Sequence, residues 1–429
     1  MIILLINLHS FFNIGDAVLA KESIKLLKNY FPESKIILAM NDPSSNYGIE
    51  ETVNSFTKFY KLTSKNTTQK WRINTIIGLF LSSLNTALFY RYFNKKFFLG
   101  MTPSQKVLIS SYLDADIVVS VAGNALYSSG NFGLQFMITT FSMAYAILLD
   151  KPLYFLPQSI GPITRKWEGM FLRWIVNQSR IVMIRESISL SQLEKFKINK
   201  QKVFQVPDLA FAYQGSEPDQ AEKWLAEQGV DIHNDGALIG ITVINWREYN
   251  QGFLEQKLYE DAVVIAINEF IKITQGKAII FTQVGGSSLV ANDYIVSKRI
   301  HKGIISTGQQ SILTDFVNSP KLIKSAYGFM DIFLGTRMHS NIFAISQGVP
   351  TLAIAYLYKT TGIMQDLGLN EWTIDIKGIE AESLTYMLIR LWNSRYNVKQ
   401  TIEENLPLLI KKTAKAGLLI HKDFLSVYS

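Results

Sequence analysis

Residues 333–359 hold the strongest candidates for chemistry, Arg337 and His339. They follow an apolar strand that ends near Gly335, and apolar residues then recur at helical spacing over 340–347. In open α/β sheets ligands bind beyond the carboxyl ends of strands, where helix N-termini favour anions. A fixed cation beside a titratable imidazole predicts an acidic substrate and a proton transfer. The alternative is that Arg337 pairs with a carboxylate while His339 caps or packs.

Three more candidates, Asn13, Gly15 and Asp16, fall at the first strand-to-helix turn. Gly15 permits a close approach of the backbone to another group. The carboxylate of Asp16 either takes part in the chemistry or caps the following helix.

Arg185 ends another apolar strand, where a charge is costly unless an anion meets it. That anion is either a ligand or a neighbouring carboxylate, Glu186 or Asp208. Asp208 follows a proline and is either a site residue or a turn carboxylate. Lys359 closes the stretch that contains Arg337, where it either reaches a phosphate or is solvated.

The amino-acid composition is typical of a protein that folds, with a modest excess of basic over acidic residues. Of 429 residues, 48% are hydrophobic and 18% charged, and 43 basic against 35 acidic residues give a net charge of +8. There is no cysteine, which excludes disulfides, thiolate metal sites and a cysteine nucleophile. The five histidines are widely separated and show no zinc-site spacing, so we expect no metal.

Several common motifs are missing. No P-loop, no GxGxxG after the first strand and no GxSxG are present. The glycine-containing loops at Gly123 and Gly285-Gly286 are weak signals individually. One short basic aromatic patch, residues 91–98, is thin support for nucleic-acid binding, so no nucleic acid is expected.

Alternating apolar strands and helical periodicities predict two α/β halves with parallel sheets and a cleft between them. We expect an N-terminal domain at 1–213, a linker at 214–235, a C-terminal domain at 236–395 and a helical segment at 396–429. Within the first domain, 41–100 reads as an irregular insertion.

Two local predictions are specific enough to check. Residues 153–156 read as a strand followed by a rigid loop at 157–163. A further strand is expected at 304–307.

The N-terminus is apolar but lacks a basic leader, and it reads as a buried strand instead of a signal peptide. Residues 73–90 carry no charge and precede the basic aromatic segment 91–98. We expect a buried or interfacial amphipathic helix at 73–90 with a basic aromatic edge. Three alternatives stay open for 73–98: spanning a membrane, contacting a membrane surface, and packing in the core or on a partner.

The ordered set of loops resembles the polysaccharide pyruvyl transferase family over residues 1 to about 370. The match lies in Asn13-Ile14-Gly15-Asp16, the Gly123 loop, Pro157-Gln158-Ser159-Ile160-Gly161-Pro162, Arg185-Glu186-Ser187, Pro207-Asp208, Gly335-Thr336-Arg337-Met338-His339, Gly348-Val349-Pro350 and Tyr356-Leu357-Tyr358-Lys359. One departure is the Gly123 loop, where Ala-Gly-Asn replaces an expected run of glycines.

This resemblance implies a GT-B-like pair of Rossmann-type domains and transfer of pyruvate from phosphoenolpyruvate to a sugar as a ketal. The family's Arg-x-His pair carries over onto Arg337 and His339, and its strand-end arginine onto Arg185. The implied acceptor is a sugar of a cell-surface polysaccharide, often on a lipid or nucleotide carrier. We therefore expect a cytoplasmic enzyme, peripheral at the inner membrane face.

The residues suit that chemistry. Phosphoenolpyruvate carries a carboxylate and a phosphate, for which Arg337, Arg185 and Lys359 supply cations. His339 is the predicted general acid, and either Asp16 or Asp208 the base. No redox cofactor or metal is expected, since phosphoenolpyruvate is the donor substrate. Two alternatives are a GT-B glycosyltransferase that uses a nucleotide sugar and a non-enzymatic glycan-binding member.

Overall fold

The structure is a computed structural model, and it describes all residues except 47, 49, 63–68, 129–132, 251, 286–292, 309 and 429. The chain divides into two compact units. Unit 1 comprises Met1–Phe11, Leu19–Leu209 and Lys412–Ser429, and unit 2 comprises Phe12–Val18 and Ala210–Lys411.

Unit 1 is built on a parallel sheet in the order β3-β2-β1-β4-β6-β7-β8, with β5 paired to β6. The strands are β1 (Ile2–Leu8), β2 (Lys35–Met40), β3 (Glu51–Asn54), β4 (Ile117–Ser120), β5 (Gly123–Leu126), β6 (Leu153–Ile160), β7 (Ile181–Ile184) and β8 (Val203–Gln205). Strands β4, β6 and β7 are buried along their whole length, because helices cover both faces of the sheet. The strand order reverses between β1 and β4.

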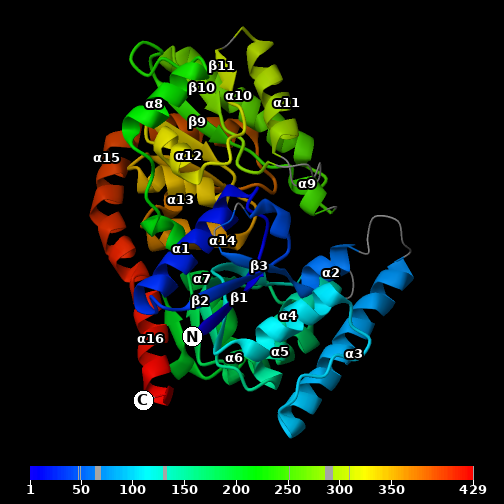
Figure 1. Cartoon of the computed structure of the whole chain (residues 1–429). Coiled ribbons are helices and arrows are strands. Elements are labelled where there is room, and N and C mark those ends of the chain that lie inside the picture. The colour runs from blue at the N-terminus through cyan, green and yellow to red at the C-terminus, as the bar shows by residue number, and fades with distance from the viewer. Residues whose placement is uncertain are drawn as a thin grey trace. The chain divides into compact units, whose positions relative to one another are not determined.

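Helices α1 and α16 lie on one face of this sheet and α4 and α5 on the other (Figure 1). The helices are α1 (Ile14–Tyr30), whose first residues group with unit 2, α2 (Phe56–Leu62), α3 (Gln69–Phe93), α4 (Pro103–Asp114), α5 (Leu134–Leu148), α6 (Lys166–Gln178), α7 (Ser187–Glu194) and α16 (Lys415–Tyr428). Asp423 on α16 accepts two hydrogen bonds of 2.9 Å from Arg180 and one of 2.7 Å from Tyr154. The C-terminal helix is thereby fixed to the sheet of unit 1.

Unit 2 is built on a second parallel sheet in the order β11-β10-β9-β12-β13-β14. The strands are β9 (Leu238–Thr242), β10 (Lys277–Ile280), β11 (Ser311–Leu313), β12 (Ile332–Gly335), β13 (Thr351–Ala355) and β14 (Thr373–Asp375). The order reverses between β9 and β12, where Gly335 pairs with Thr242. That reversal is the position at which doubly wound sheets bind ligands.

With the strand order β11-β10-β9-β12-β13-β14, the right-handed rule for crossovers puts α10 and α11 on one face of this sheet and α12 to α14 on the other. The helices are α8 (Pro218–Glu227), α9 (Trp246–Tyr249), α10 (Gln256–Thr274), α11 (Tyr294–Ile305), α12 (Pro320–Tyr327), α13 (Met338–Ser346), α14 (Tyr358–Asp366) and α15 (Ala381–Thr413). Short 3-10 turns lie at Pro43–Ser45, Lys200–Lys202, Leu209–Ala212 and Asn370–Trp372. The prediction of two α/β halves with parallel sheets is confirmed.

The boundaries of the two units differ from those of the expected domains. The first boundary lies between Leu209 and Ala210, and the segment 214–235 groups with unit 2. Its helix α8 packs on α12 and buries Trp224 and Leu225. The segment 396–429 is divided between the units after Lys411.

Three local predictions differ from the structure. The expected loop at 157–163 begins as strand, because β6 continues to Ile160 and a register shift between Phe155 and Gln158 accommodates Pro157. The expected strand at 304–307 is the end of α11 and the turn after it. The segment 41–100 contains β3, α2 and α3.

Helix α3 confirms the helix expected at 73–90, but it is not clearly amphipathic. Apolar side chains occupy its exposed face, for example Leu81 and Leu88, as well as its buried face, for example Leu79. In the part of the chain that the structure describes, no helix combines the length and apolar character needed to cross a membrane.

Candidate functional site

Hydroxyl groups fix the reversal point of the unit 2 sheet. The Thr336 amide donates to the Thr242 carbonyl at 2.9 Å, and the hydroxyls of Thr242 and Ser340 are hydrogen-bonded. The buried Tyr259 hydroxyl lies 2.8 Å from that of Thr336. These bonds hold the carboxyl ends of β9 and β12 and the first turn of α13 in one rigid arrangement.

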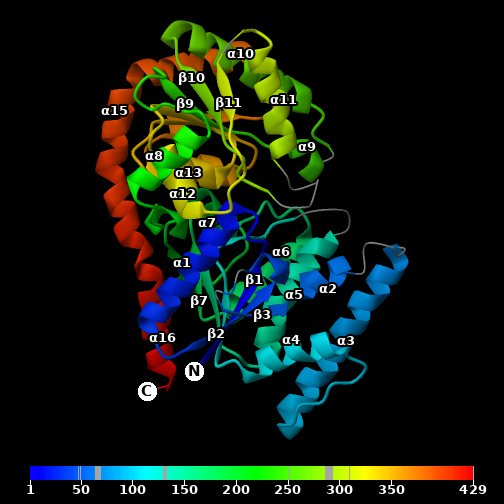
Figure 2. The ribbon, with the colours of Figure 1, turned by 45° about the horizontal axis from the view of Figure 1, so that its top comes forward.

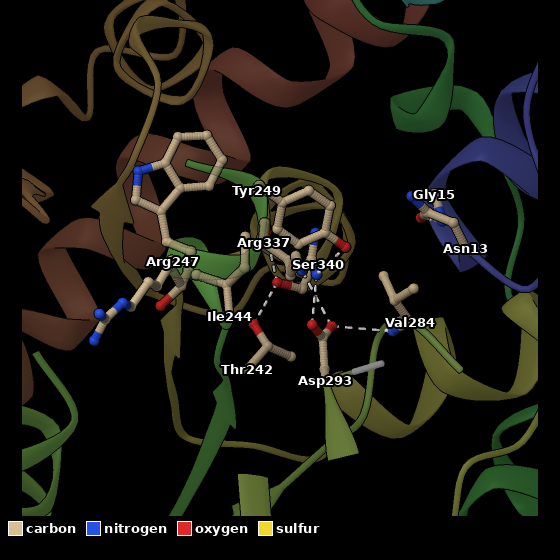
Figure 3. Close-up of polar contacts among 12 residues, drawn as sticks. Asn13, Gly15, Thr242, Ile244, Arg247, Tyr249, Val284, Asp293, Arg337 and Ser340 are labelled. Atoms are coloured by element: carbon tan, nitrogen blue, oxygen red, sulfur yellow. Dashed lines mark hydrogen bonds and ion pairs between the residues drawn. The ribbon is translucent and has the colours of Figure 1, made fainter. Parts of the chain in front are cut away.

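Arg337 is the residue that precedes α13, and it is only 8% exposed. Its Nε donates to Oδ2 of Asp293 at 3.0 Å and its Nη2 to Oδ1 of the same carboxylate. Nη2 also donates to the Tyr249 hydroxyl at 3.2 Å, and the guanidinium lies 5.3 Å from the centre of that ring. Figure 3 shows the guanidinium between Asp293 and Tyr249, with Arg247 pointing away from the pair.

Burial lowers the pKa of Arg337, but Asp293, Tyr249 and Tyr356 together outweigh it and raise that pKa well above its usual range. Burial also raises the pKa of Asp293, and the attraction of Arg337 acts in the opposite direction. Oδ2 of Asp293 also accepts a 3.1 Å hydrogen bond from the Val284 amide. Arg337 therefore pairs with a carboxylate, which is the alternative to ligand binding. The sequence does not indicate that Asp293 is the partner.

His339 lies in the first turn of α13 and is half-buried. The backbone of Gly15 approaches it so closely that a Cβ on Gly15 would stand 2.0 Å from the imidazole Nδ1. The segment that carries Gly15 is held in unit 2 by backbone hydrogen bonds from Ile14 to Gln283, 3.3 Å, and from Gly285 to Phe12, 3.0 Å. The turn that contains Gly15 therefore lies against the imidazole of His339.

Asn13 caps helix α1. Its Oδ1 accepts from the Gly15 amide at 3.1 Å, and its carbonyl accepts from Ala17 at 3.0 Å. Asp16 lies in the first helical turn and is half-buried. The capping role considered for Asp16 thus belongs to Asn13.

Aromatic rings continue the site toward Lys359. The ring of Tyr356, just after β13, lies 4.6 Å from that of Trp246, and Trp246 stacks on Tyr249 at 6.1 Å. Lys359 Nζ lies 5.7 Å from the Tyr356 ring, in the first turn of α14. Lys359, the starts of α13 and α14 and the Tyr249–Trp246–Tyr356 rings therefore lie at the carboxyl edge of one sheet.

Two buried polar side chains on these helices lack hydrogen-bond partners among the described residues. They are the amide of Asn341 on α13 and the hydroxyl of Thr360 on α14. A Cβ on Gly335 would stand 1.8 Å from Oδ1 of Asn341, so only glycine fits beside that amide. Neither residue carries a sequence signal that distinguishes it from an ordinary helix residue.

The remaining predicted residues lie in unit 1. Arg185 is 3% exposed and donates to Oδ2 of Asp208 at 2.7 Å and to the Ser159 hydroxyl at 2.6 Å. Glu186 lies 3.6 Å from Arg185 and accepts hydrogen bonds from Ser159 and Ser189. One guanidinium thus faces two buried carboxylates, which is again the internal pairing considered as an alternative.

Burial raises the pKa of Glu186 to about 7, although Arg185 acts in the opposite direction. A carboxyl group that titrates near neutrality is characteristic of functional sites and also of structural ion networks. The Glu186 carboxylate contacts Arg185, Ser159 and Ser189 of this cluster.

Gln158 and Gly123 pair with each other where β5 meets β6. The side chain of Gln158 is buried, and it donates to the Val121 carbonyl and to the Ser120 hydroxyl at 3.3 Å. These contacts hold the end of β4, next to the strand-order reversal of unit 1.

The structure therefore groups the predicted residues in two sets. Asn13, Gly15, Asp16, Arg337, His339 and Lys359 belong to unit 2, whereas Gly123, Gln158, Arg185 and Asp208 belong to unit 1. Gly285 is described, but its neighbour Gly286 lies outside the described residues. Within the described ranges, no three His, Asp or Glu side chains are grouped as a metal ion requires.

Sequence comparison gives a family match over most of the chain. The pattern described as polysaccharide pyruvyl transferase matches residues 13–358. The amylovoran biosynthesis protein AmsJ of Erwinia amylovora is 27% identical over 235 residues, which cover 54% of this chain and 56% of AmsJ. The alignment thus spans little more than half of that relative.

Structural comparison gives the fold. The UDP-GlcNAc 2-epimerase of Neisseria meningitidis aligns with a TM-score of 0.56 at 13% identity, covering 99% of this chain and 100% of the epimerase. Sucrose-phosphate synthase of Thermosynechococcus elongatus aligns with a TM-score of 0.56 at 11% identity, covering 100% and 99%. Both are GT-B enzymes, so the GT-B-like fold expected from the sequence is confirmed. At such identities the likeness says nothing about substrate.

Proposed function

Because the chain belongs to the polysaccharide pyruvyl transferase family, we propose that it moves pyruvate from phosphoenolpyruvate onto a sugar as a ketal. The acceptor is a sugar of a cell-surface polysaccharide or of its lipid- or nucleotide-linked precursor. The relationship to an amylovoran biosynthesis protein supports a role in polysaccharide synthesis.

The close contact between Gly15 and His339 is the observation that carries this proposal. Both residues fall within matched segments, and a substituent on Gly15 would strike Nδ1 of the imidazole at 2.0 Å. His339 is also in the first turn of α13, whose N-terminus favours an anion. A positioned imidazole beside an anion-favouring helix end suits proton transfer to a bound phosphoenolpyruvate.

The reaction consumes one donor and two hydroxyls of the sugar. His339 gives a proton to the methylene carbon of phosphoenolpyruvate, and a sugar hydroxyl oxygen forms a bond to the adjacent carbon. Phosphate leaves that carbon with its bonding electrons, and the second hydroxyl oxygen takes its place. The two hydroxyl protons pass to a base and to solvent, so that the products are the ketal and inorganic phosphate.

The difference in solvent exposure favours Asp16 over Asp208 as the base that accepts a hydroxyl proton of the sugar. Asp208 is buried and bonded to Arg185, whereas Asp16 is half-buried in the unit that also contains His339. Lys359 and the first turns of α13 and α14 supply positive charge for the carboxylate and phosphate. Arg337 contributes through a guanidinium whose orientation Asp293 fixes. Arg185, carried over as a phosphoenolpyruvate ligand, stays a prediction.

The test measures phosphate release from phosphoenolpyruvate with and without candidate acceptor glycans. The expected result is acceptor-dependent phosphate release and an acceptor that gains the mass of pyruvate less one water. Phosphoenolpyruvate should also raise the melting temperature, because a ligand stabilises the state that binds it. Stabilisation by UDP but not by phosphoenolpyruvate would instead support a nucleotide-sugar glycosyltransferase.

A further inference from the structure

Positive charge is concentrated in one part of unit 1. Residues 52–113 contain no acidic residue, and the basic side chains that the structure describes there are Lys58, Arg91, Lys95, Lys96 and Lys106. Helix α6 adds exposed Lys166 and Arg173, while its one acidic residue, Glu168, is buried and paired with Arg165 at 2.8 Å. A surface with such an excess of positive charge attracts an anionic partner.

The same region exposes large apolar side chains. In both views α3 lies at the edge of unit 1, alongside α2, α4 and α5 (Figures 1 and 2). Its inner face packs through Phe80, which stacks on Phe141 of α5 at 3.8 Å. Its outer face and the residues after it expose Ile77, Leu81, Leu88, Tyr92, Phe93, Phe97 and Leu99.

An apolar groove continues this face across α3, α5 and α6. It has a volume of about 510 Å³ and is lined by Phe80, Met137, Phe141, Trp167, Met170, Phe171 and Trp174. Phe80 and Phe141 are buried, whereas Met170 is 73% exposed. A second hollow of about 300 Å³ is lined by Asn85, Leu88, Phe89, Tyr92, Phe93, Phe97 and Leu99. Exposed apolar surface on this scale marks an interaction site.

Charge decides which partner suits the surface. Arg91 and Lys96 each contact one exposed aspartate, Asp150 and Asp114, and such exposed pairs contribute little stabilisation. Lys95, Lys166 and Arg173 are exposed beside the apolar residues. Aromatic and aliphatic side chains interleaved with cations match the boundary between anionic headgroups and acyl chains.

We propose that the face formed by α3, α5 and α6 docks on an anionic lipid bilayer and that the groove takes up a lipid hydrocarbon chain. This face, called the docking face below, comprises the lining residues of both hollows together with Arg91, Lys95, Lys96, Lys166 and Arg173. Docking needs neither phosphoenolpyruvate nor a sugar, so its test is independent of the proposed reaction.

Vesicle co-sedimentation of the full chain tests the proposal. We expect binding to vesicles of phosphatidylcholine mixed with phosphatidylglycerol, weaker binding to phosphatidylcholine alone, and loss of the difference at high salt. The triple variant Arg91→Gln/Lys95→Gln/Lys96→Gln should bind the anionic vesicles at least ~10-fold more weakly, since each cation near the surface contributes to attraction. Met170→Asp should lower binding to both kinds of vesicle.

Matched controls exclude a general effect of altered charge. Leu254 is 74% exposed in unit 2, so Leu254→Asp places the same carboxylate at an equally exposed apolar position. Lys399→Gln/Lys411→Gln/Lys412→Gln removes three exposed cations from α15. Both controls should bind vesicles like the wild type.

Tryptophan fluorescence locates the insertion. Lipids brominated on the acyl chain should quench the wild type, and Trp167→Phe/Trp174→Phe should lose most of that quenching. Undiminished quenching in this variant would overturn the groove assignment. Absence of vesicle binding by the wild type would overturn the docking face altogether, as would self-association that Met170→Asp abolishes, because the occupant would then be a second copy.

Discussion

Gly15 and His339 are in contact at a distance that only glycine allows: a Cβ on Gly15 would come within 2.0 Å of the imidazole Nδ1 and 2.8 Å of its Cβ. The backbone of Gly15 is not in the left-handed region, so the requirement for glycine is steric alone. Any side chain here must displace the imidazole.

Gly15→Ala should therefore reduce activity while the protein stays folded. A displacement of about 1 Å of a catalytic group can cost ~10²-fold in rate. We expect acceptor-dependent phosphate release to fall by about that factor, with a far-ultraviolet circular dichroism spectrum like that of the wild type. Gly78→Ala is the matched control, since a Cβ there meets nothing within 4 Å and the position is helical. Equal activity of Gly15→Ala and wild type would show that the contact is irrelevant to catalysis.

His339→Ala tests the proton donor directly. A positioned general acid contributes about 10²–10⁴-fold, so kcat should fall by that factor. Binding of phosphoenolpyruvate should persist, because the proposed role is proton delivery; thermal shift with the donor alone measures this. Retention of full activity would remove His339 from the mechanism.

The Arg337–Asp293 pair makes a prediction about stability. Asp293→Asn removes the carboxylate and leaves a buried guanidinium without its counter-charge, which costs about 3–5 kcal/mol. Urea unfolding should show a lower midpoint with an unchanged slope. The double variant Arg337→Met/Asp293→Leu should recover much of the loss, since no isolated charge then remains.

Activity measurements on the same variants distinguish a role of Asp293 in positioning Arg337 from a role in stability alone. If Asp293 orients Arg337 for the donor, the double variant stays inactive although it is stable. Recovery of both stability and activity in the double variant would make the pair purely structural.

The ends of strands are easier to predict from this sequence than the partners of the residues that follow them. Arg337 and Arg185 were found because each follows an apolar strand, a signal within a few residues of the side chain itself. Asp293 is not evident from the sequence, because it precedes α11 and approaches Arg337 only when α11 packs on the sheet that contains β10 and β12. The close contact of Gly15 with His339 likewise depends on tertiary structure.

Two further features of unit 1 are hard to predict from the sequence pattern. Periodicity detects a helix when one face is apolar and the opposite face polar. On α3 both faces are apolar, with Leu79 buried and Leu81 exposed, so the sequence predicts a helix at 73–90 but does not show which face is buried. The sequence pattern predicts that the strand ends before Pro157, whereas β6 continues to Ile160. The register shift that accommodates this proline depends on the neighbouring strand.

Glu186 predicts how stability changes with pH. Burial raises the pKa of its carboxyl group to about 7 from an ordinary value of 4.5. Between these values the folded state keeps a proton that the unfolded state has lost, so the contribution is complete below about pH 4.5 and disappears as pH rises through 7. The shift corresponds to roughly 3 kcal/mol.

The measurement compares free energies of unfolding of wild type and Glu186→Gln from urea titrations at pH 5 and pH 8. Glutamine has nearly the same shape and cannot ionise; its amide oxygen can accept the hydrogen bond of one serine, Ser159 or Ser189, and its NH2 group can donate to the hydroxyl of the other. The wild type should lose more stability than the variant over this interval, because only the wild type must place a second negative charge beside Asp208 and Arg185. Parallel losses in the two proteins would mean that Glu186 ionises without penalty, with Arg185 fully compensating both carboxylates.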